Sequence, residues 1–144
     1  MVKNICAAIA TSCKLTNNES KLLIILTDHV WDDDIFIESV NRGLYLVNDG
    51  LWCLGIKPSY AENGYGYLNY SGDNLIKIVE NPNKETAEEY LKSGNYLWNS
   101  GNFLFSNKMM TSELISHAND IYESVSKTLD NSGDLSKDEI KLNK

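Results

Sequence analysis

Two aliphatic segments flank an amphipathic segment near the start of the chain, and this spacing constrains the fold more than any other feature. Lys21–Thr27 is a continuous aliphatic run and Leu51–Ile56 is a second one. A fully apolar run is typical of a strand covered on both faces, as in a parallel sheet. Between the runs lie three acids, Asp32, Asp33 and Asp34. An apolar stripe at helical spacing follows them, formed by Phe36, Val40, Leu44 and Val47. Strand, helix and strand within about 35 residues favour a right-handed βαβ unit, so we expect an α/β fold with a mostly parallel sheet.

The remaining segments predict elements that flank this sheet. The small residues of Asn4–Leu15 favour a helix packed closely on a sheet, and Lys84–Ser93 is a short helix that ends at Gly94. An added β-hairpin is expected from Tyr65–Tyr70 and Leu75–Val79. Tyr96–Phe105 is a strand interrupted at residues 99–101, and one or two helices then run to about Leu129. Residues 130–144 form a polar tail.

Charge and cysteine content exclude several classes of protein. The formal charge of -7 over 144 residues, with no basic patch, argues against a nucleic-acid partner. The three cysteines show no Cys-x-x-Cys spacing, so neither a disulfide framework nor a structural zinc site is indicated. The longest aliphatic run is too short to span a bilayer, and we expect a cytoplasmic protein without a membrane partner.

Asp28 is the candidate metal ligand. It follows the first predicted strand directly, and open α/β sheets bind ligands at the carboxyl ends of their strands. A carboxylate at that edge suits Mg²⁺, although a helix cap or a turn acid is an equally ordinary role for it. Its neighbour His29 is interpreted as structural, because nothing nearby in the sequence completes a zinc or nucleophilic arrangement.

Three further stretches have the composition of a polyol-binding wall. Tyr65 and Gly66 belong to a Gly-Tyr-Gly-Tyr hairpin whose backbone can approach a ligand closely. Glu80 ends an apolar strand, where it could accept hydrogen bonds from sugar hydroxyls, but a solvated acid is the simpler alternative. Polar residues break the apolar pattern of the last strand, which indicates a site: Asn99, Ser100 and Gly101.

Taken in order, these pieces resemble the mannose-1-phosphate guanylyltransferase family from about Asn4 to Tyr122. The resemblance is carried by five segments, namely residues 27–30 (TDHV), 55–58 (GIKP), 64–67 (GYGY), Val79-Glu80-x-Pro82 and residues 96–105 (YLWNSGNFLF). No single segment is decisive, but their order is specific.

The resemblance implies a nucleotide-diphospho-sugar transferase fold of Rossmann-like type, in which mannose 1-phosphate attacks the α-phosphate of GTP to give GDP-mannose and pyrophosphate with the help of Mg²⁺. It implies that Asp28 is a metal ligand near the phosphates. It also implies that a mannose-binding wall is formed by Gly66, Glu80, Asn99 and Gly101. Tyr65 and Ser100 would support this wall.

The chain also departs from the family pattern. Nothing before Met1-Val2-Lys3 supplies the family's Gly-rich triphosphate loop, and Asn81 stands where a lysine is usual. An amide does not replace that charge. We therefore expect residues 1–129 to be a partial nucleotidyltransferase domain, an internal portion without the N-terminal loop and the C-terminal region, that is inactive by itself.

Two functional hypotheses follow. In the first, the chain holds the sugar-binding half of a guanylyltransferase and needs a complementing chain for activity. In the second, it is a catalytically inactive remnant or an oligomerising sugar-phosphate-binding module. A partial sheet leaves an open edge and apolar surface, so we also expect a homo-oligomer. The sequence does not fix the sugar or the base.

Overall fold

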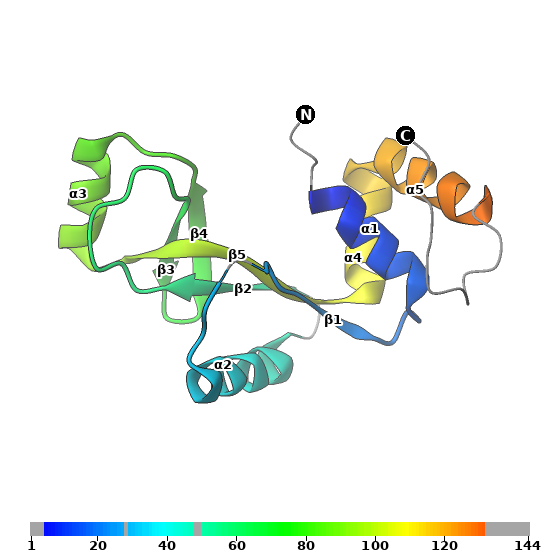
Figure 1. The fold of residues 1–144 in the computed structure, drawn as a ribbon, viewed down its shortest axis with the longest axis horizontal. Coiled ribbons are helices and arrows are strands. Elements are labelled where there is room, and N and C mark those ends of the chain that lie inside the picture. The colour runs from blue at the N-terminus through cyan, green and yellow to red at the C-terminus, as the bar shows by residue number, and fades with distance from the viewer. Residues whose placement is uncertain (1–4, 28, 48–49, 132–144) are drawn as a thin grey trace. The chain divides into compact units, whose positions relative to one another are not determined.

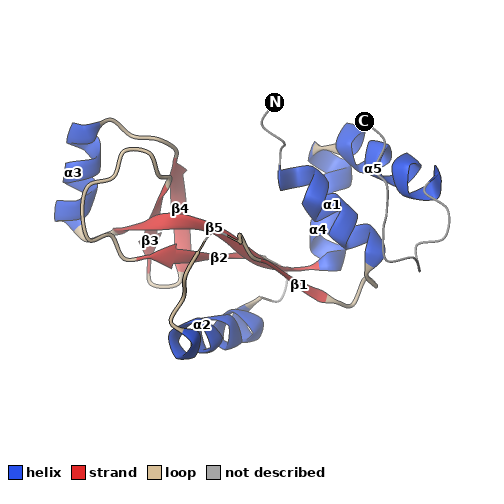
Figure 2. Cartoon of the chain, viewed as in Figure 1, coloured by secondary structure: helices blue, strands red, loops and turns tan. Residues whose placement is uncertain are grey.

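The computed structural model describes residues 5–27, 29–47 and 50–131, which contain five helices and five strands (Figure 1). In chain order these elements are α1 (Ile5–Leu15), β1 (Lys21–Ile24), α2 (Asp33–Leu46), β2 (Leu51–Ile56), β3 (Tyr67–Ser71), β4 (Asn74–Val79), α3 (Lys84–Ser93), β5 (Tyr96–Ser106), α4 (Asn107–His117) and α5 (Asn119–Asn131). Helices and strands are both well represented (Figure 2), as expected for an α/β chain.

The prediction of a mostly parallel, Rossmann-like sheet is wrong. The strands lie in the order β1-β5-β3-β4, with β2 also paired to β5, and β3 is antiparallel to both β4 and β5. The expected hairpin is not an addition beside the sheet, because β3 also pairs with β5 and its antiparallel direction continues into the sheet. Residues 72–73 form the tight turn of this hairpin, between Ser71 and its partner Asn74. A two-residue connection can only join antiparallel strands, and Gly72 supplies the required positive φ of 60°.

The chain divides into two compact units. Unit 1 contains Met1–Ile24, Arg42–Leu51 and Leu104–Lys144, and unit 2 contains Ile25–Asn41 and Trp52–Phe103. Strand β5 therefore belongs to both, with the portion up to Phe103 in unit 2. The expected boundary between a domain and a polar tail at residue 129 stays a prediction; α5 continues to Asn131, and residues 132–144 lie outside the described part of the chain.

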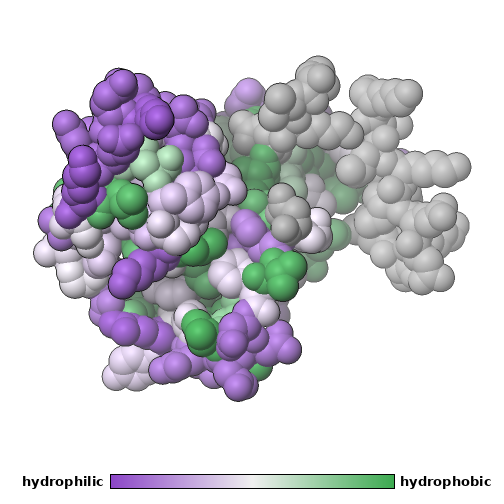
Figure 3. All heavy atoms as spheres, turned by 60° about the vertical axis from the view of Figure 1, so that its left-hand side comes forward, coloured by the Kyte–Doolittle hydropathy of each residue, from purple (hydrophilic) through white to green (hydrophobic). Residues whose placement is uncertain are grey.

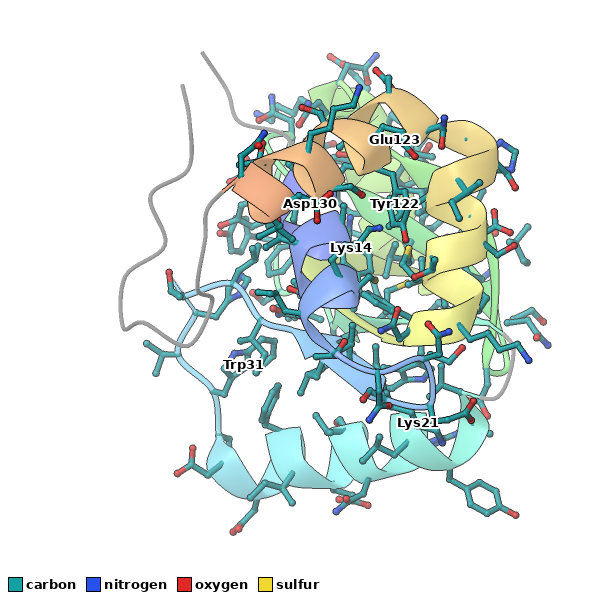
Figure 4. The ribbon with its side chains drawn as sticks, turned by 90° about the vertical axis from the view of Figure 1, so that its right-hand side faces the viewer. Lys14, Lys21, Trp31, Tyr122, Glu123 and Asp130 are labelled. Atoms are coloured by element: carbon teal, nitrogen blue, oxygen red, sulfur yellow. The ribbon has the colours of Figure 1, made fainter. Side chains whose placement is uncertain are left out.

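In unit 1 the helices α1, α4 and α5 pack against one another. Their buried apolar side chains are Ile9, Ala10, Cys13, Leu114 and Leu129. At the surface of this cluster, Lys14 of α1 lies over the ring of Tyr122 of α5, with its Nζ 4.2 Å from the ring centroid (Figure 4). This cation–π contact links two helices of the cluster.

Asn107, the first residue of α4, closes the carboxyl end of α1. Its side chain is fully buried, and its Nδ2 lies 2.9 Å from the carbonyl oxygen of Cys13 and 3.0 Å from that of Asn17. Thr16 offers two further acceptors to the same Nδ2, its carbonyl oxygen at 3.2 Å and its Oγ1 at 2.9 Å. The last carbonyls of a helix lack partners within the helix, so this amide supplies a donor at the end of α1.

In unit 2 the core forms where the β3–β5 pair meets α3. Tyr67, Ala87 and Trp98 are buried together, and Tyr90 of α3 stacks on Tyr96 of β5 with ring centroids 3.8 Å apart. Helix α3 has the bounds predicted for it. Asn83 caps its first turn by accepting a hydrogen bond from the backbone N–H of Thr86 at 2.8 Å, and Gly94 ends it in the left-handed conformation with φ 70°.

Strand β4 lies at one end of the strand order, and its aliphatic side chains are exposed: Leu75, Ile76 and Ile78. Hydrophobic side chains also interrupt the hydrophilic surface in the face shown in Figure 3. Self-association through such a surface stays a prediction. No described helix has both the length and the apolar character needed to cross a membrane.

Candidate sugar-binding wall

Three of the predicted site residues lie side by side where β4, β3 and β5 meet. Tyr67 of β3 is paired with Val79 on one side and with Trp98 on the other. One residue away along each strand, Gly66 comes to lie between Glu80 and Asn99. The backbone N–H of Asn99 donates to the carbonyl oxygen of Gly66 at 2.7 Å, which fixes this row. The sheet thus brings together residues that the sequence analysis named from three separate stretches of the chain.

Gly66 leaves room for the carboxylate of Glu80. A Cβ placed on Gly66 would lie 2.9 Å from both Oε1 and Oε2 of Glu80, closer than real Cβ atoms approach such groups. Any side chain at this position would therefore displace the carboxylate. Asn81, which follows, has a φ of 44°, a left-handed conformation that asparagine tolerates better than most residues. The backbone turns away directly after Glu80, so its exposed carboxylate ends the strand.

The Asn99–Gly101 stretch forms a bend within β5. The Oδ1 of Asn99 accepts a hydrogen bond from the backbone N–H of Gly101 at 3.0 Å, and Gly101 has a φ of 70°. This bond identifies Oδ1 as the acceptor and leaves Nδ2 as the donor that Asn99 can offer to a ligand. The predicted interruption at residues 99–101 is thus a local bend in a strand that runs on to Ser106.

Ser100 lies in the interior rather than at the surface. It is 4% exposed, and its Oγ donates to the carbonyl oxygen of Leu54 at 2.7 Å. The same Oγ accepts from the backbone N–H of Asn102 at 3.2 Å and from Asn102 Nδ2 at 3.1 Å. Its hydroxyl therefore links β5 to β2, and a direct contact with a substrate stays a prediction.

Asn102 was not predicted as a site residue, yet it is fully buried beside the bend. Its Oδ1 accepts from the backbone N–H of Leu26 at 2.7 Å, and its Nδ2 lies 3.5 Å from Nδ1 of His29. The signal was present in the sequence, because Asn102 is a further polar residue in the apolar strand whose break drew attention to Asn99. A buried asparagine without partners would be costly, so its position alone indicates a hydrogen-bond network.

Tyr65 is half-exposed and lies just before β3, the first strand of the β3–β4 hairpin. Its ring meets Trp98 edge-on with centroids 5.3 Å apart, and Tyr60 contacts the same indole at 4.9 Å. The Nε1 of Trp98 is buried and has no hydrogen-bond partner within the described chain. The aromatic side chains thus pack as one group, with Tyr65 at its exposed margin.

The proposed metal ligand Asp28 lies outside the described residues. Among the residues that are described, no group of three or more His, Cys, Asp or Glu side chains is arranged to hold a metal ion. A magnesium site at Asp28 therefore stays a prediction. His29 is partly buried and meets the ring of Trp31 edge-on, with centroids 5.3 Å apart.

Comparison with known proteins places these residues in context. The family model for nucleotidyl transferases matches residues 1–140. The chain is 37% identical over 133 residues to a mannose-1-phosphate guanylyltransferase of Salmonella typhimurium, covering 85% of this chain and 28% of that protein. It is 35% identical over 162 residues to mannose-1-phosphate guanylyltransferase 2 of Escherichia coli O157:H7, covering 99% of this chain and 33% of that protein. The chain thus spans about a third or less of the length of these relatives.

Solved structures show the same fold. A crystal structure of mannose-6-phosphate isomerase from Helicobacter pylori superposes with a TM-score of 0.81 at 25% identity, covering 90% of this chain and 53% of that one. A crystal structure from Thermus thermophilus, described as a mannose-1-phosphate geranyltransferase, gives a TM-score of 0.77 at 24% identity, covering 92% of this chain and 42% of that one. The second likeness supports the fold alone.

Proposed function

Because this chain belongs to the nucleotidyl transferase family, we propose that it carries the sugar-binding part of a mannose-1-phosphate guanylyltransferase. The overall reaction is the attack of a phosphate oxygen of mannose 1-phosphate on the α-phosphate of GTP. The new oxygen–phosphorus bond gives GDP-mannose, and the bond to the β-phosphate breaks to release pyrophosphate. The substrates are proposed from the activity named for the relatives, of which this chain covers 28% and 33%.

The row of Glu80, Gly66 and Asn99 is the observation that carries this proposal. The two oxygens of a carboxylate can accept hydrogen bonds from two neighbouring hydroxyls, the arrangement that a sugar ring offers. The amide of Asn99 supplies a donor from the other side of Gly66. Since Gly66 has no side chain, the Glu80 carboxylate can lie directly over it, within the row.

In the reaction, these residues bind and orient rather than transfer protons. Phosphoryl transfer depends mainly on positioning and on the stabilisation of charge. Holding the sugar ring by its hydroxyls directs its phosphate towards the nucleotide. Asp28 is proposed to hold Mg²⁺, which would neutralise phosphate charge when bound. Tyr65 and Ser100 are proposed to support the wall, and Gly101 to shape its bend.

Calorimetric titration of the chain with mannose 1-phosphate tests the proposal. In Gly66→Ala the new Cβ displaces the Glu80 carboxylate, which is the flexible end of an exposed side chain, so binding is lost at little cost to folding. Glu80→Gln keeps the shape and removes the charge. Losing a hydrogen bond to a charged group costs about 1.5–3 kcal/mol, so we expect binding to weaken by roughly 10- to 100-fold.

Gly50→Ala is the matched control. A Cβ on Gly50 would meet no atom within 4 Å, and Gly50 lies outside the predicted wall, so its affinity should equal that of the parent chain. Parallel titrations with glucose 1-phosphate, mannose and inorganic phosphate separate recognition of the sugar from that of the phosphate. Equal affinity of the parent, G66A and E80Q chains for mannose 1-phosphate would remove this wall from the proposal. Binding without conversion when GTP and Mg²⁺ are added would favour a binding module over an enzyme.

A further inference from the structure

The buried side chain of Asn102 joins three separate stretches of unit 2. Its Oδ1 accepts from the backbone N–H of Leu26 at 2.7 Å. Its Nδ2 lies 3.1 Å from Ser100 Oγ, which in turn donates to the carbonyl oxygen of Leu54. The same Nδ2 lies 3.5 Å from Nδ1 of His29. Leu26 follows β1, Leu54 lies in β2 and Asn102 lies in β5. One amide therefore links β5 to the segment after β1 directly and to β2 through Ser100.

The contact with Leu26 fixes the orientation of the Asn102 amide. A backbone N–H is always a donor, so the atom that faces it at 2.7 Å must be the amide oxygen. The amide nitrogen is then the atom that faces His29. Since Nδ2 can only donate, Nδ1 of His29 must accept. A neutral imidazole that accepts through Nδ1 carries its proton on Nε2.

The bend at Asn99–Gly101 contacts Leu26 as well. A Cβ on Gly101 would lie 2.8 Å from Cδ1 of Leu26, so the glycine permits a close approach at this point. The backbone of Leu26 is hydrogen-bonded to Asn102 and its side chain lies against Gly101. The position of Leu26 is therefore tied to the residues that shape the sugar-binding wall.

We propose that Asn102 is a positioning residue, which anchors Leu26 beside the Asn99–Gly101 bend and holds the neutral His29 ring with its proton on Nε2. As a statement about sugar-phosphate binding this inference rests on the proposed function. As a statement about the His29 ring it rests only on the contacts of Asn102.

Long-range ¹⁵N–¹H NMR of the histidine rings tests the inference without a ligand. The chain has two histidines, and the spectra are recorded at about pH 8, above the range in which histidine side chains ordinarily titrate. The parent chain should show His29 protonated on Nε2. Asn102→Asp keeps an acceptor for the Leu26 N–H but presents a carboxylate oxygen to His29, so the proton should move to Nδ1. His117, which lies on α4 beside Glu113, serves as the internal control and should not change.

Asn102→Leu is the second variant, because a buried carboxylate could prevent folding. It removes every side-chain hydrogen bond of Asn102 while keeping its approximate volume. In N102L the His29 ring signals should shift towards a mixture of tautomers, and the amide of Leu26 should exchange with solvent faster than in the parent. A His29 proton on Nδ1 in the parent, or His29 signals unchanged in both variants, would overturn the inference.

Binding then shows whether this positioning affects the wall. If it does, N102L should bind mannose 1-phosphate about tenfold more weakly than the parent, with Gly50→Ala again unchanged. A parent chain with the expected tautomer and no affinity for mannose 1-phosphate would count against the proposed function alone. A parent chain that binds while its His29 carries the proton on Nδ1 would count against the role of Asn102 alone.

Discussion

Replacing Asn107 by leucine should destabilise unit 1 severely, because one amide satisfies the end of a helix. Four acceptors lie within 3.2 Å of its Nδ2, which carries only two hydrogens, so about two directed bonds are shared among them. Thr16 and Asn17 are exposed, and water can replace the amide there. Cys13 is buried, so its carbonyl oxygen would remain without a partner.

The expected cost follows from these bonds. An unsatisfied buried carbonyl costs about 1–3 kcal/mol, and each further lost bond about 0.5–1.5 kcal/mol, including the one from Thr111 Oγ1 to Asn107 Oδ1 at 2.8 Å. The apolar leucine side chain offsets part of this loss, so we expect Asn107→Leu to lower the free energy of unfolding by about 2–4 kcal/mol. Urea unfolding followed by circular dichroism measures the change, and with a slope of about 1–3 kcal/mol per molar urea the midpoint falls by about 1 M or more.

Two further variants test the reasoning behind this value. Thr111→Val removes only the bond to Asn107 Oδ1 and should cost about 1 kcal/mol. Asn107→Asp keeps that bond but directs a carboxylate oxygen at carbonyl oxygens, so it should be less stable than Asn107→Leu. A leucine variant within about 0.5 kcal/mol of the parent chain, or an aspartate variant as stable as the parent, would refute the capping role.

Two other outcomes follow from local features. Asn83→Ala removes the cap of α3 and should lower stability by about 1 kcal/mol in the same unfolding assay, whereas Asn63→Ala in an exposed turn should not; equal effects would argue against the cap. Burial raises the pKa of the Cys53 thiol, so the folded state holds this proton longer than the unfolded state does. The contribution of Cys53 to stability is therefore complete below the pKa that the thiol has in the unfolded chain, and it is lost as pH rises through the pKa in the folded chain. Between about pH 7 and 10, the unfolding midpoint should therefore fall less in Cys53→Ala than in the parent chain.

Local patterns predicted most elements because short-range signals determine them. Leu51–Ile56 and Lys84–Ser93 have the bounds that their apolar runs and stop signals indicate. The direction of the strands could not be read in the same way. The aliphatic run beginning at Lys21 suggested a strand buried on both faces, yet β1 is at most partly buried. Hydrophobicity reports burial only approximately and carries no information about which strands become neighbours.

The candidate site was predictable in part for a related reason. Gly66, Glu80 and Asn99 each stand at a break in a local pattern, and their order resembles a known family. That they form one row depends on the register of β3 with two other strands, which no local pattern encodes. Asn102 was missed although it also breaks the apolar pattern, because its partners, Leu26 and His29, lie far from it in the sequence and are brought to it only by the fold.

Strand β5 is hydrogen-bonded to β1, β2 and β3, yet it is the last of the five strands to be synthesised. All of the chain between Ile24 and Tyr96 must be translated after β1 before β5 begins. At a ribosomal rate of about 5–20 residues per second, β1 waits for roughly 4–14 seconds before its partner β5 exists. During that interval its aliphatic side chains have no partner strand. Production of this chain in cells should therefore depend on chaperones, and the yield of soluble protein should rise when the cells grow slowly at low temperature.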